Sequence, residues 1–260
     1  MKSKRKSKVC SLILIALLSM LTYGCKKDKE KEIEYGTVSD IDGNSYKTVK
    51  IGTQEWMAEN LRTTKYRNGD TIPNAASDSI PQANSDTAWM NLTTGVYFTA
   101  PCCVGDWTFV PEDVITYGRL YDWYAVNDSR NIAPEGWHVP TDEDWTILVD
   151  YLGGDSVAGG KMKEEGTLHW ESPNANATNE SGFTARGAGY FGEYLGFVMI
   201  GFVMTECCWW SSAEYDSMCA WSREVCNCNY QNTIYGTYGG RIYRFGQAKY
   251  FGLSVRCVKD

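Results

Sequence analysis

The stretch that decides the fold is residues 134–154, PEGWHVPTDEDWTILVDYLGG. Its second half carries the signals of a helix. Thr141 precedes the apolar positions and Asp144 follows three residues later, which is the spacing of a capping box. Apolar side chains then recur at helical spacing until Gly153, a typical residue for the end of a helix. We therefore predict a helix with one buried face, formed by Trp145, Leu148, Val149 and Leu152.

Other periodicities appear on both sides of this helix. Residues 46–51 alternate between apolar and polar after an Asp-Gly turn, which predicts a strand, and residues 251–257 alternate in the same way. Residues 117–127 place apolar side chains at helical spacing and predict a second helix. Residues 68–116 and 221–250 show little periodicity and many turn-forming residues, so we expect long irregular loops there.

The pattern of residues 1–24 is typical of a secretory signal peptide, because basic residues precede an apolar run of 13 residues over 9–21. That run is shorter than the roughly 18 to 20 residues of a membrane-spanning helix. Gly24 before Cys25 resembles the bacterial lipobox, which predicts lipidation of Cys25, with ordinary cleavage or an uncut anchor as the alternatives. Residues 25–37 are then a lipidated cysteine and a charged tether, and residues 38–260 are the folded domain.

The charge of the chain excludes one class of partner. Loss of residues 1–24 removes five of the 25 basic residues and none of the 32 acidic residues, which leaves 20 against 32 and a net charge of −12. Nucleic acid is not an expected partner, because phosphate binding requires a basic surface. We expect an exported bacterial lipoprotein, held to the membrane by its lipid anchor, at the outer membrane or the cell surface.

Several stretches in order along the chain resemble the Fibrobacter succinogenes major paralogous domain family, whose members are exported bacterial proteins and are often carried on lipoproteins. The stretches are DIDGNSYKTVKIGTQEWMAENL (40–61), YGRLYDWYAVND (117–128), PEGWHVPTDEDW (134–145), NESGFTARGAGY (179–190), WWSSAEYD (209–216) and GLSVRCVKD (252–260). The resemblance implies an α+β, C-type-lectin-like fold with mixed sheets, two flanking helices and long irregular loops. In such a fold the chain ends meet, so segments 46–51 and 253–258 should share a sheet.

The cysteines suggest disulfides. An even number besides Cys25 in an exported chain favours bridges, although their pairing stays open. The alternative is a zinc site, although two of its cysteines would be closer together in sequence than zinc ligands usually are. Family members commonly carry a cysteine in place of Ala133, which leaves the partner of Cys257 undefined. The disulfide candidates are Cys102, Cys103, Cys207, Cys208, Cys219, Cys226, Cys228 and Cys257, and the alternative zinc set is Cys207, Cys219, Cys226 and Cys228.

No catalytic or metal motif is evident. The sequence has no H-E-x-x-H or C-x-x-C, and Ser211 lacks a G-x-S-x-G context. His138 is expected to be a hydrogen-bonded structural imidazole. Calcium has no motif support, because the Glu-Pro-Asn and Trp-Asn-Asp strings of lectin-like relatives are missing and residues 40–44 fit a hairpin turn better than an EF-hand loop. We therefore expect no catalytic residue, no metal and no cofactor.

The aromatic residues divide into two groups. Those in the family stretches are expected in the core, because large rings dominate burial; they are Trp56, Trp123, Trp137, Trp145 and Trp209. Rings in the predicted loops 88–116 and 221–250 are expected either to contact a ligand or to pack the loop onto its own domain. The ligand candidates are Trp107, Trp221, Tyr235, Tyr238 and Tyr243.

These observations favour a lipid-anchored, extracellular, non-catalytic binding module for polysaccharide or for another surface protein. Two alternatives stay open. The resemblance extends to formylglycine-generating enzymes, which oxidise a sulfatase cysteine with a pair of thiols, so an oxidase-like enzyme is one alternative. The other alternative is a structural component of the cell surface.

Overall fold

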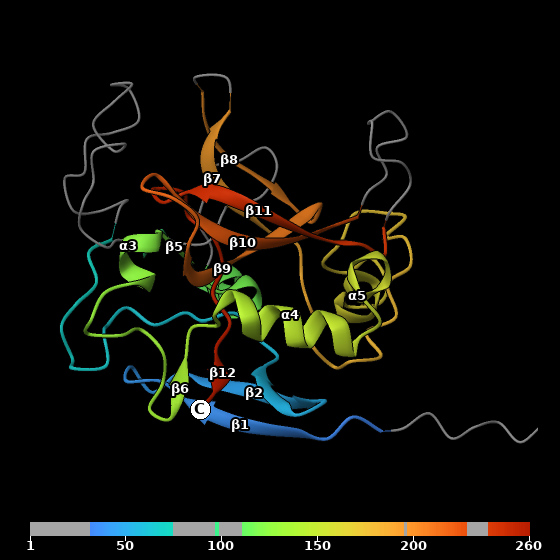
Figure 1. The fold of residues 1–260 in the computed structure, drawn as a ribbon, viewed down its shortest axis with the longest axis horizontal. Helices are drawn as coiled ribbons and strands as arrows, with labels where there is room; N and C mark the ends of the chain where they lie inside the picture. Colours follow the sequence, from blue (N-terminus) through green and yellow to red (C-terminus); the bar gives the residue numbers. More distant parts are fainter. Residues whose placement is uncertain (1–31, 75–96, 99–110, 195–196, 228–238) are drawn as a thin grey trace, which may run out of the picture. The chain divides into compact units, whose positions relative to one another are not determined.

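The computed structural model describes residues 32–74, 97–98, 111–194, 197–227 and 239–260. Residues 33–260 form one unit with mixed sheets and a few helices, an α+β fold (Figure 1). None of the described helices is long and apolar enough to cross a membrane. The helices are α2 (Pro111–Tyr117), α3 (Trp123–Val126), α4 (Asp142–Tyr151) and α5 (Asp155–Met162). The strands are β1 (Tyr35–Ser39), β2 (Ser45–Ile51), β3 (Gln54–Met57), β4 (Tyr97–Phe98), β5 (Leu120–Tyr121), β6 (Trp137–His138), β7 (Ala188–Tyr194), β8 (Phe197–Val203), β9 (Glu206–Glu214), β10 (Cys219–Cys226), β11 (Ile242–Ala248) and β12 (Val258–Lys259).

The base sheet joins the two ends of the unit. Its strand order is β1-β2-β3-β12-β6, and every neighbouring pair is antiparallel. Gly43, with a φ of 79°, donates its N–H to the Asp40 carbonyl and closes the β1–β2 hairpin. In β12, Val258 pairs with Trp56 on one side and His138 on the other. The prediction that segments 46–51 and 253–258 share a sheet is confirmed at Val258, with β3 between the two segments.

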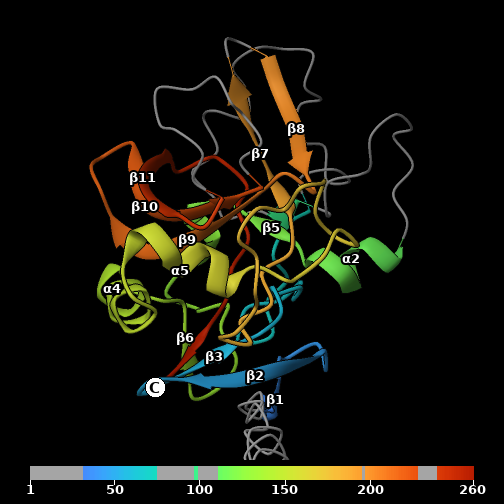
Figure 2. The same ribbon diagram turned by 90° about the vertical axis from the view of Figure 1, so that its right-hand side faces the viewer.

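The second sheet lies at the other end of the unit from the base sheet (Figure 2). Its strand order is β11-β10-β9-β7-β8. The β7–β9 pair is parallel at Gly189 and Cys207, and the other neighbours are antiparallel. Helix α4 packs against β9 and helix α5 against β11. This sheet therefore has one face covered by the two helices over part of its area.

Strand β9 separates two hydrophobic cores, because successive side chains of a strand point to opposite faces. Cys207 and Trp209 belong to the core that contains Trp145, whereas Cys208 and Trp210 belong to the other core. The five tryptophans expected in the core are confirmed there, each 5% exposed or less.

Helix α4 follows the sequence prediction closely. The Thr141 hydroxyl accepts a hydrogen bond from the Asp144 N–H at 3.1 Å, and the Asp144 carboxylate accepts one from the Thr141 N–H at 2.9 Å. This reciprocal capping box is the predicted one. The buried face is confirmed for Trp145, Leu148, Val149 and Leu152.

The predicted helix over 117–127 is wrong. Helix α2 ends at Tyr117, and Gly118 follows with a φ of 80°. The chain then forms β5 and only one helical turn, α3, whose N-cap Asp122 accepts from the Ala125 N–H at 2.8 Å. The apolar spacing was real, but a glycine in the left-handed region and an Asp cap divide the segment.

Helix α5 was missed because its sequence, DSVAGGKM, has two adjacent glycines, which are poor helix formers. The structure shows why these glycines are required. A Cβ on Gly159 would clash with the Arg241 carbonyl, and one on Gly160 would clash with the Asn176 carbonyl. The helix is therefore stabilised by close packing of its backbone against neighbouring backbone.

Three further expectations need correction. Residues 221–250 are not one irregular loop, since they include most of β10 and all of β11. Residues 251–257 form isolated bridges at Gly252, Leu253 and Ser254 instead of a continuous strand. Strand β1 begins at Tyr35, so the fold starts inside the segment assigned to the tether.

A buried guanidinium group connects these parts. Arg256 is 1% exposed, and its Nε donates to the Asn60 side-chain oxygen at 2.8 Å. Its two terminal nitrogens donate to the carbonyls of Phe183 and Thr184, and its guanidinium carbon lies 4.1 Å from the centre of the Phe183 ring. Burial lowers the pKa of Arg256 to about 9, which leaves it protonated at neutral pH.

Asn60 extends this network into the second sheet. Its side-chain oxygen also accepts from the Trp209 indole N–H at 2.9 Å, and its amide donates to the Tyr117 carbonyl at 2.8 Å and to the Ser254 hydroxyl at 3.2 Å. We call Asn60, Arg256 and Trp209 the central hydrogen-bond network. It joins the segment after β3, the C-terminal segment and β9.

The Arg256→Met variant should lose about 3 kcal/mol or more of the free energy of unfolding, because it leaves buried carbonyls without donors. Urea unfolding followed by tryptophan fluorescence measures this loss. The matched control is Arg130→Met, which removes an arginine with exposed ion pairs to Asp70 and Asp128 and should change stability much less. Equal losses in the two variants would contradict the role assigned to Arg256.

Candidate functional site

The structure describes two of the five ligand candidates and places them on opposite faces of the second sheet. In β10, Trp221 pairs with Gly246, whereas Glu224 pairs with Tyr243 of β11. Trp221 and Glu224 are three residues apart on a strand, so Trp221 and Tyr243 point to opposite sides. The candidates Trp107, Tyr235 and Tyr238 lie outside the described residues.

The Trp221 ring is engaged in contacts within the chain. The Arg244 guanidinium lies 3.2 Å from the centre of its ring, and the Tyr215 ring meets it at 4.5 Å in an edge-on arrangement. Gly246 allows this packing, since a Cβ there would lie 2.8 Å from the Tyr215 ring. These contacts favour the packing alternative for Trp221.

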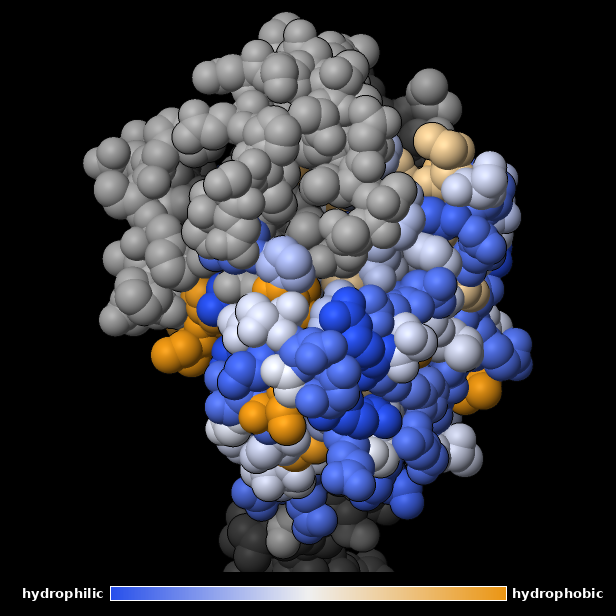
Figure 3. All heavy atoms as spheres, turned by 90° about the vertical axis from the view of Figure 1, so that its left-hand side faces the viewer, coloured by the Kyte–Doolittle hydropathy of each residue, from blue (hydrophilic) through white to orange (hydrophobic). Residues whose placement is uncertain are grey.

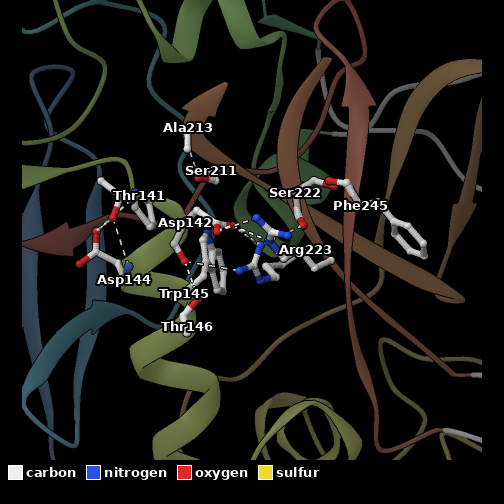
Figure 4. Close-up of polar contacts among 12 residues, drawn as sticks. Thr141, Asp142, Asp144, Trp145, Thr146, Ser211, Ala213, Ser222, Arg223 and Phe245 are labelled. Carbon is white, nitrogen blue, oxygen red and sulfur yellow. Dashed lines mark hydrogen bonds and ion pairs between the residues drawn. The ribbon is translucent and has the colours of Figure 1, made fainter. Parts of the chain in front are cut away.

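Asp142 at the start of α4 fixes the arginines on this side of the sheet (Figure 4). Its carboxylate accepts from Arg244 at 2.9 and 3.0 Å and from the buried Arg223 at 2.8 Å. Burial tends to raise the pKa of Asp142, but the hydrogen bonds from both arginines outweigh burial and hold that pKa below its usual value. This arrangement ties α4 to β10 and β11.

The opposite side of the sheet presents a pair of stacked rings. Tyr243 and Phe245 lie on the same face of β11, with ring centres 5.8 Å apart and an angle of 12° between the ring planes. Phe245 is 42% exposed and Tyr243 is half-buried. In the strand order of the described residues, β11 is at the edge of its sheet. The rings therefore lie at the rim of this face.

Two half-buried carboxyl groups lie on the same face as the stacked rings. Glu224 pairs with Tyr243 on one side and with Cys208 of β9 on the other, and Glu206 is two residues before Cys208. The Cys208 thiol is 3.7 Å from the Glu224 carboxylate. We call the side of the sheet that carries Glu206, Glu224, Tyr243 and Phe245, with the buried Cys208 between the glutamates, the carboxyl–aromatic face.

Both carboxyl groups have pKa values well above the usual value for a glutamate. Burial raises the pKa of Glu206 to about 7. Burial, followed by the charge of Glu206, raises the pKa of Glu224 to about 8. Neither carboxylate forms an ion pair with a basic residue in the described part of the chain. Strongly shifted carboxyl groups without a structural partner are a physical indication of a functional site.

A second group of rings flanks the carboxyl groups on the β7 side. Tyr190 of β7 stacks on Phe202 at 5.3 Å and on Phe251 at 6.2 Å between ring centres. Tyr190 packs against the same core as Cys208. The carboxyl groups thus lie between the rings of β11 and the group of rings around Tyr190 of β7. Such a surface can stack on apolar faces of a ligand and form hydrogen bonds with its polar groups.

The sequence model of the Fibrobacter succinogenes major domain family matches residues 49–259. The chain belongs to this family. No curated relative and no solved structure matches it.

The motifs that carry the resemblance to the Fibrobacter succinogenes major domain have structural roles in this chain. Arg256 and Trp209, from two of these motifs, belong to the central hydrogen-bond network. The ring nitrogens of His138 lie 2.7 Å from Asp260 and 3.2 Å from Asp144, which confirms the structural imidazole. The residues of the carboxyl–aromatic face lie outside these motifs but within the stretch that the family model matches.

The disulfide expectation is wrong for most of the described cysteines. Cys207, Cys208, Cys219 and Cys257 are free, and Cys226 is disulfide-bonded. Cys207 and Cys208 cannot bridge each other because they project into different cores. The remaining candidates, Cys102, Cys103 and Cys228, lie outside the described residues.

The zinc alternative is also excluded by the strand geometry. Cys219 and Cys226 are the two ends of β10, which separates them by about 23 Å at 3.3 Å per residue. Zinc ligands must all lie within about 2.3 Å of the metal. Within the described ranges, no group of three or more His, Cys, Asp or Glu side chains could hold a metal ion.

Sequence reasoning missed Glu206, Glu224 and Phe245. Each is ordinary in its local context, and only the β9–β10–β11 register brings them together. The alternation of Tyr243 and Phe245 was the one local signal of a shared face. The many glycines and asparagines around it are typical of a loop and obscure this signal.

The double variant Glu206→Gln/Glu224→Gln should change how stability depends on pH. Folding raises the pKa of each carboxyl from its unfolded value near 4.5 to about 7 or about 8. The protonated carboxyl therefore contributes its full share of the free energy of unfolding below pH 4.5, and this contribution is lost as the pH rises through the folded pKa. The glutamines cannot ionise, so the variant should be more stable than the wild type at pH 8.5, by on the order of 1–3 kcal/mol after allowance for partial exposure.

Thermal unfolding at pH 5 and at pH 8.5 measures this difference. Glu165→Gln, at an exposed glutamate, is the control and should follow the wild-type pH dependence. An unchanged pH dependence in the double variant would show that the two carboxyl groups are not shifted.

Proposed function

We propose that this chain is a non-catalytic module that binds polysaccharide through the carboxyl–aromatic face. The observation that carries the proposal is the stacked pair Tyr243 and Phe245 on an outer strand, with Phe245 42% exposed and Glu224 directly across from Tyr243. Aromatic ring faces offer apolar contact to the C–H faces of sugar rings. Adjacent carboxyl groups can hydrogen-bond to sugar hydroxyls in either protonation state.

A polysaccharide fits this surface better than a protein partner does. Protein interfaces usually include a buried apolar centre. On the face drawn in Figure 3, the described surface is mainly hydrophilic and its hydrophobic residues form separate small patches. The carboxyl–aromatic face likewise combines two rings with two carboxyl groups instead of a broad apolar area.

We also propose the finer C-type-lectin-like description of the fold. The sharing of the base sheet by β2 and β12 supports it, as does the position of the second sheet at the other end of the unit. In lectin-like folds the ligand region lies opposite the joined chain ends. The carboxyl–aromatic face belongs to the second sheet, which is consistent with that position.

The attachment to the membrane is part of the same proposal. A lipid on Cys25 would anchor an exported bacterial lipoprotein at the outer membrane or the cell surface. The chain enters the folded unit at β1, in the base sheet. The proposal includes no nucleic acid, no metal and no cofactor.

The free thiols of the described residues favour binding over the oxidase-like alternative. Redox chemistry requires an accessible thiolate. Burial raises the pKa of Cys207 to about 11, and burial together with the charges of the nearby glutamates raises the pKa of Cys208 well above its usual value. Burial also raises the pKa of Cys219, the least buried free thiol in the described ranges. These thiols are poor nucleophiles at neutral pH.

The double variant Tyr243→Ala/Phe245→Ala should lower affinity for a bound polysaccharide about tenfold or more, because two ring contacts of about 1 kcal/mol each are lost. Pull-down on insoluble cellulose, chitin and xylan, followed by titration on the polymer that binds, measures the loss. The control Leu168→Ala removes an apolar side chain that is 77% exposed elsewhere and should bind normally. Unchanged binding by the ring variant would refute the proposed face.

The Cys25→Ala variant tests the anchor separately. It should not incorporate radiolabelled palmitate in bacteria and should move from the membrane fraction to the soluble or secreted fraction. The Cys10→Ala variant is the matched control, because Cys10 lies within the apolar run of the signal peptide and should leave labelling intact. Labelling of the Cys25 variant at the wild-type level would exclude lipidation at this residue.

A further inference from the structure

The carboxyl groups of Glu206 and Glu224 have no evident role in holding the fold together. The Glu224 carboxylate has one weak hydrogen bond, from the Cys208 thiol at 3.7 Å, and burial is the sole cause of the Glu206 pKa shift. Removing a carboxylate from water without a cation is unfavourable. Elsewhere in this chain such groups are compensated, as Asp142 is by Arg223 and Arg244.

We propose that Glu206 and Glu224 select uncharged sugar chains over acidic ones at the carboxyl–aromatic face. This inference rests on the proposed function. Glu224 lies across from Tyr243, so a sugar stacked on the rings would present hydroxyl groups to its carboxyl. A uronate or sulfate in the same place would bring a further negative charge beside two carboxyl groups that already repel each other.

Within the described part of the chain, no positive charge compensates the two carboxyl groups. Among the described residues, Cys208 of β9 and Tyr243 of β11 are titratable groups opposite Glu224, and Tyr190 of β7 packs against the same core as Cys208. Arg241 precedes β11 on the same side, and its guanidinium lies 5.6 Å from the centre of the Tyr243 ring. No described basic residue contributes to the pKa shift of either carboxyl group.

Arg223 and Arg244 cannot supply the missing positive charge. Their side chains lie on the other face of the sheet, where Asp142 holds both of them. Arg241 lies beside the Tyr243 ring and contributes to the pKa of neither carboxyl group. An acidic polymer on the carboxyl–aromatic face would therefore meet two carboxyl groups that form no ion pair with a described basic residue. Such discrimination works by repulsion of the wrong ligand as well as by attraction of the right one.

The selectivity should depend on pH. Both carboxyl groups are largely protonated at pH 5.5 and largely ionised at pH 9, given pKa values of about 7 and about 8. Repulsion of an acidic chain should therefore increase between these two values. Affinity for a neutral chain should change much less, because a carboxyl can donate or accept a hydrogen bond when protonated and can accept one when ionised.

A pair of polymers with the same backbone tests the inference. The full-length chain in detergent is immobilised, and binding of neutral hydroxyethyl cellulose and acidic carboxymethyl cellulose is measured by biolayer interferometry at pH 5.5 and pH 9. We expect the wild type at pH 9 to bind the neutral polymer about tenfold or more tightly than the acidic one, which corresponds to about 1.4 kcal/mol. At pH 5.5 this ratio should fall towards one.

The Glu206→Gln/Glu224→Gln variant separates charge from shape. It should bind the two polymers to within about threefold at both pH values, whereas the exposed control Glu165→Gln should keep the wild-type ratio. Thermal unfolding at each pH shows whether the variants are folded. Equal binding of both polymers by the wild type at pH 9, or an unchanged ratio in the double glutamine variant, would overturn the inference.

The same experiment distinguishes failure of this inference from failure of the proposed function. If Tyr243→Ala/Phe245→Ala loses binding and the glutamine variant keeps its selectivity, the rings bind the polymer and the inference alone is wrong. If the ring variant binds both polymers as the wild type does, the proposed function is wrong as well. Lack of wild-type binding to the neutral polymer counts against the selectivity for uncharged chains.

Discussion

The fold depends on the burial of one positive charge. Arg256 is 1% exposed, and its desolvation is tolerated only because the carbonyls of Phe183 and Thr184 and the side chain of Asn60 all accept its hydrogen bonds. Asn60 in turn accepts from the indole of Trp209 in β9. Three segments that are distant in sequence must therefore meet at one point, which fixes β9 relative to the base sheet.

Once β9 is fixed, its alternation organises the rest of the second sheet. Trp209 and Cys207 face the core under α4, whereas Trp210 and Cys208 face the other core. The carboxyl–aromatic face is the continuation of that second side towards the sheet edge, where burial decreases from Cys208 to Glu224 and then to Phe245. The site thus lies at the margin of a core, where a carboxyl group loses much of its hydration and a ring is still accessible.

The sequence predicts those elements that are determined by residues close together in the chain. The α4 helix was predicted because its cap, its buried face and its terminal glycine all lie within about four turns of one another. Residues 117–127 do not form the predicted helix because Gly118 takes up a left-handed conformation and Asp122 caps a separate helical turn, and these two local effects override the apolar spacing. The carboxyl pair could not be predicted, since Glu206 and Glu224 become neighbours only through a strand register that no local pattern defines.

The same register explains why this face is suited to hydrogen bonding and not to thiol chemistry. Cys208 lies between the two glutamates, so any loss of its proton would place a third negative charge in a poorly hydrated environment, and its pKa is raised accordingly. The raised pKa values make the thiol less reactive but make the glutamates more versatile. Near neutral pH the glutamates can donate hydrogen bonds as well as accept them. A chain with a formal net charge of −7 has little long-range attraction for anions. Rings and partly protonated carboxyls together therefore favour a ligand that is flat on one side, rich in hydroxyl groups and without charge.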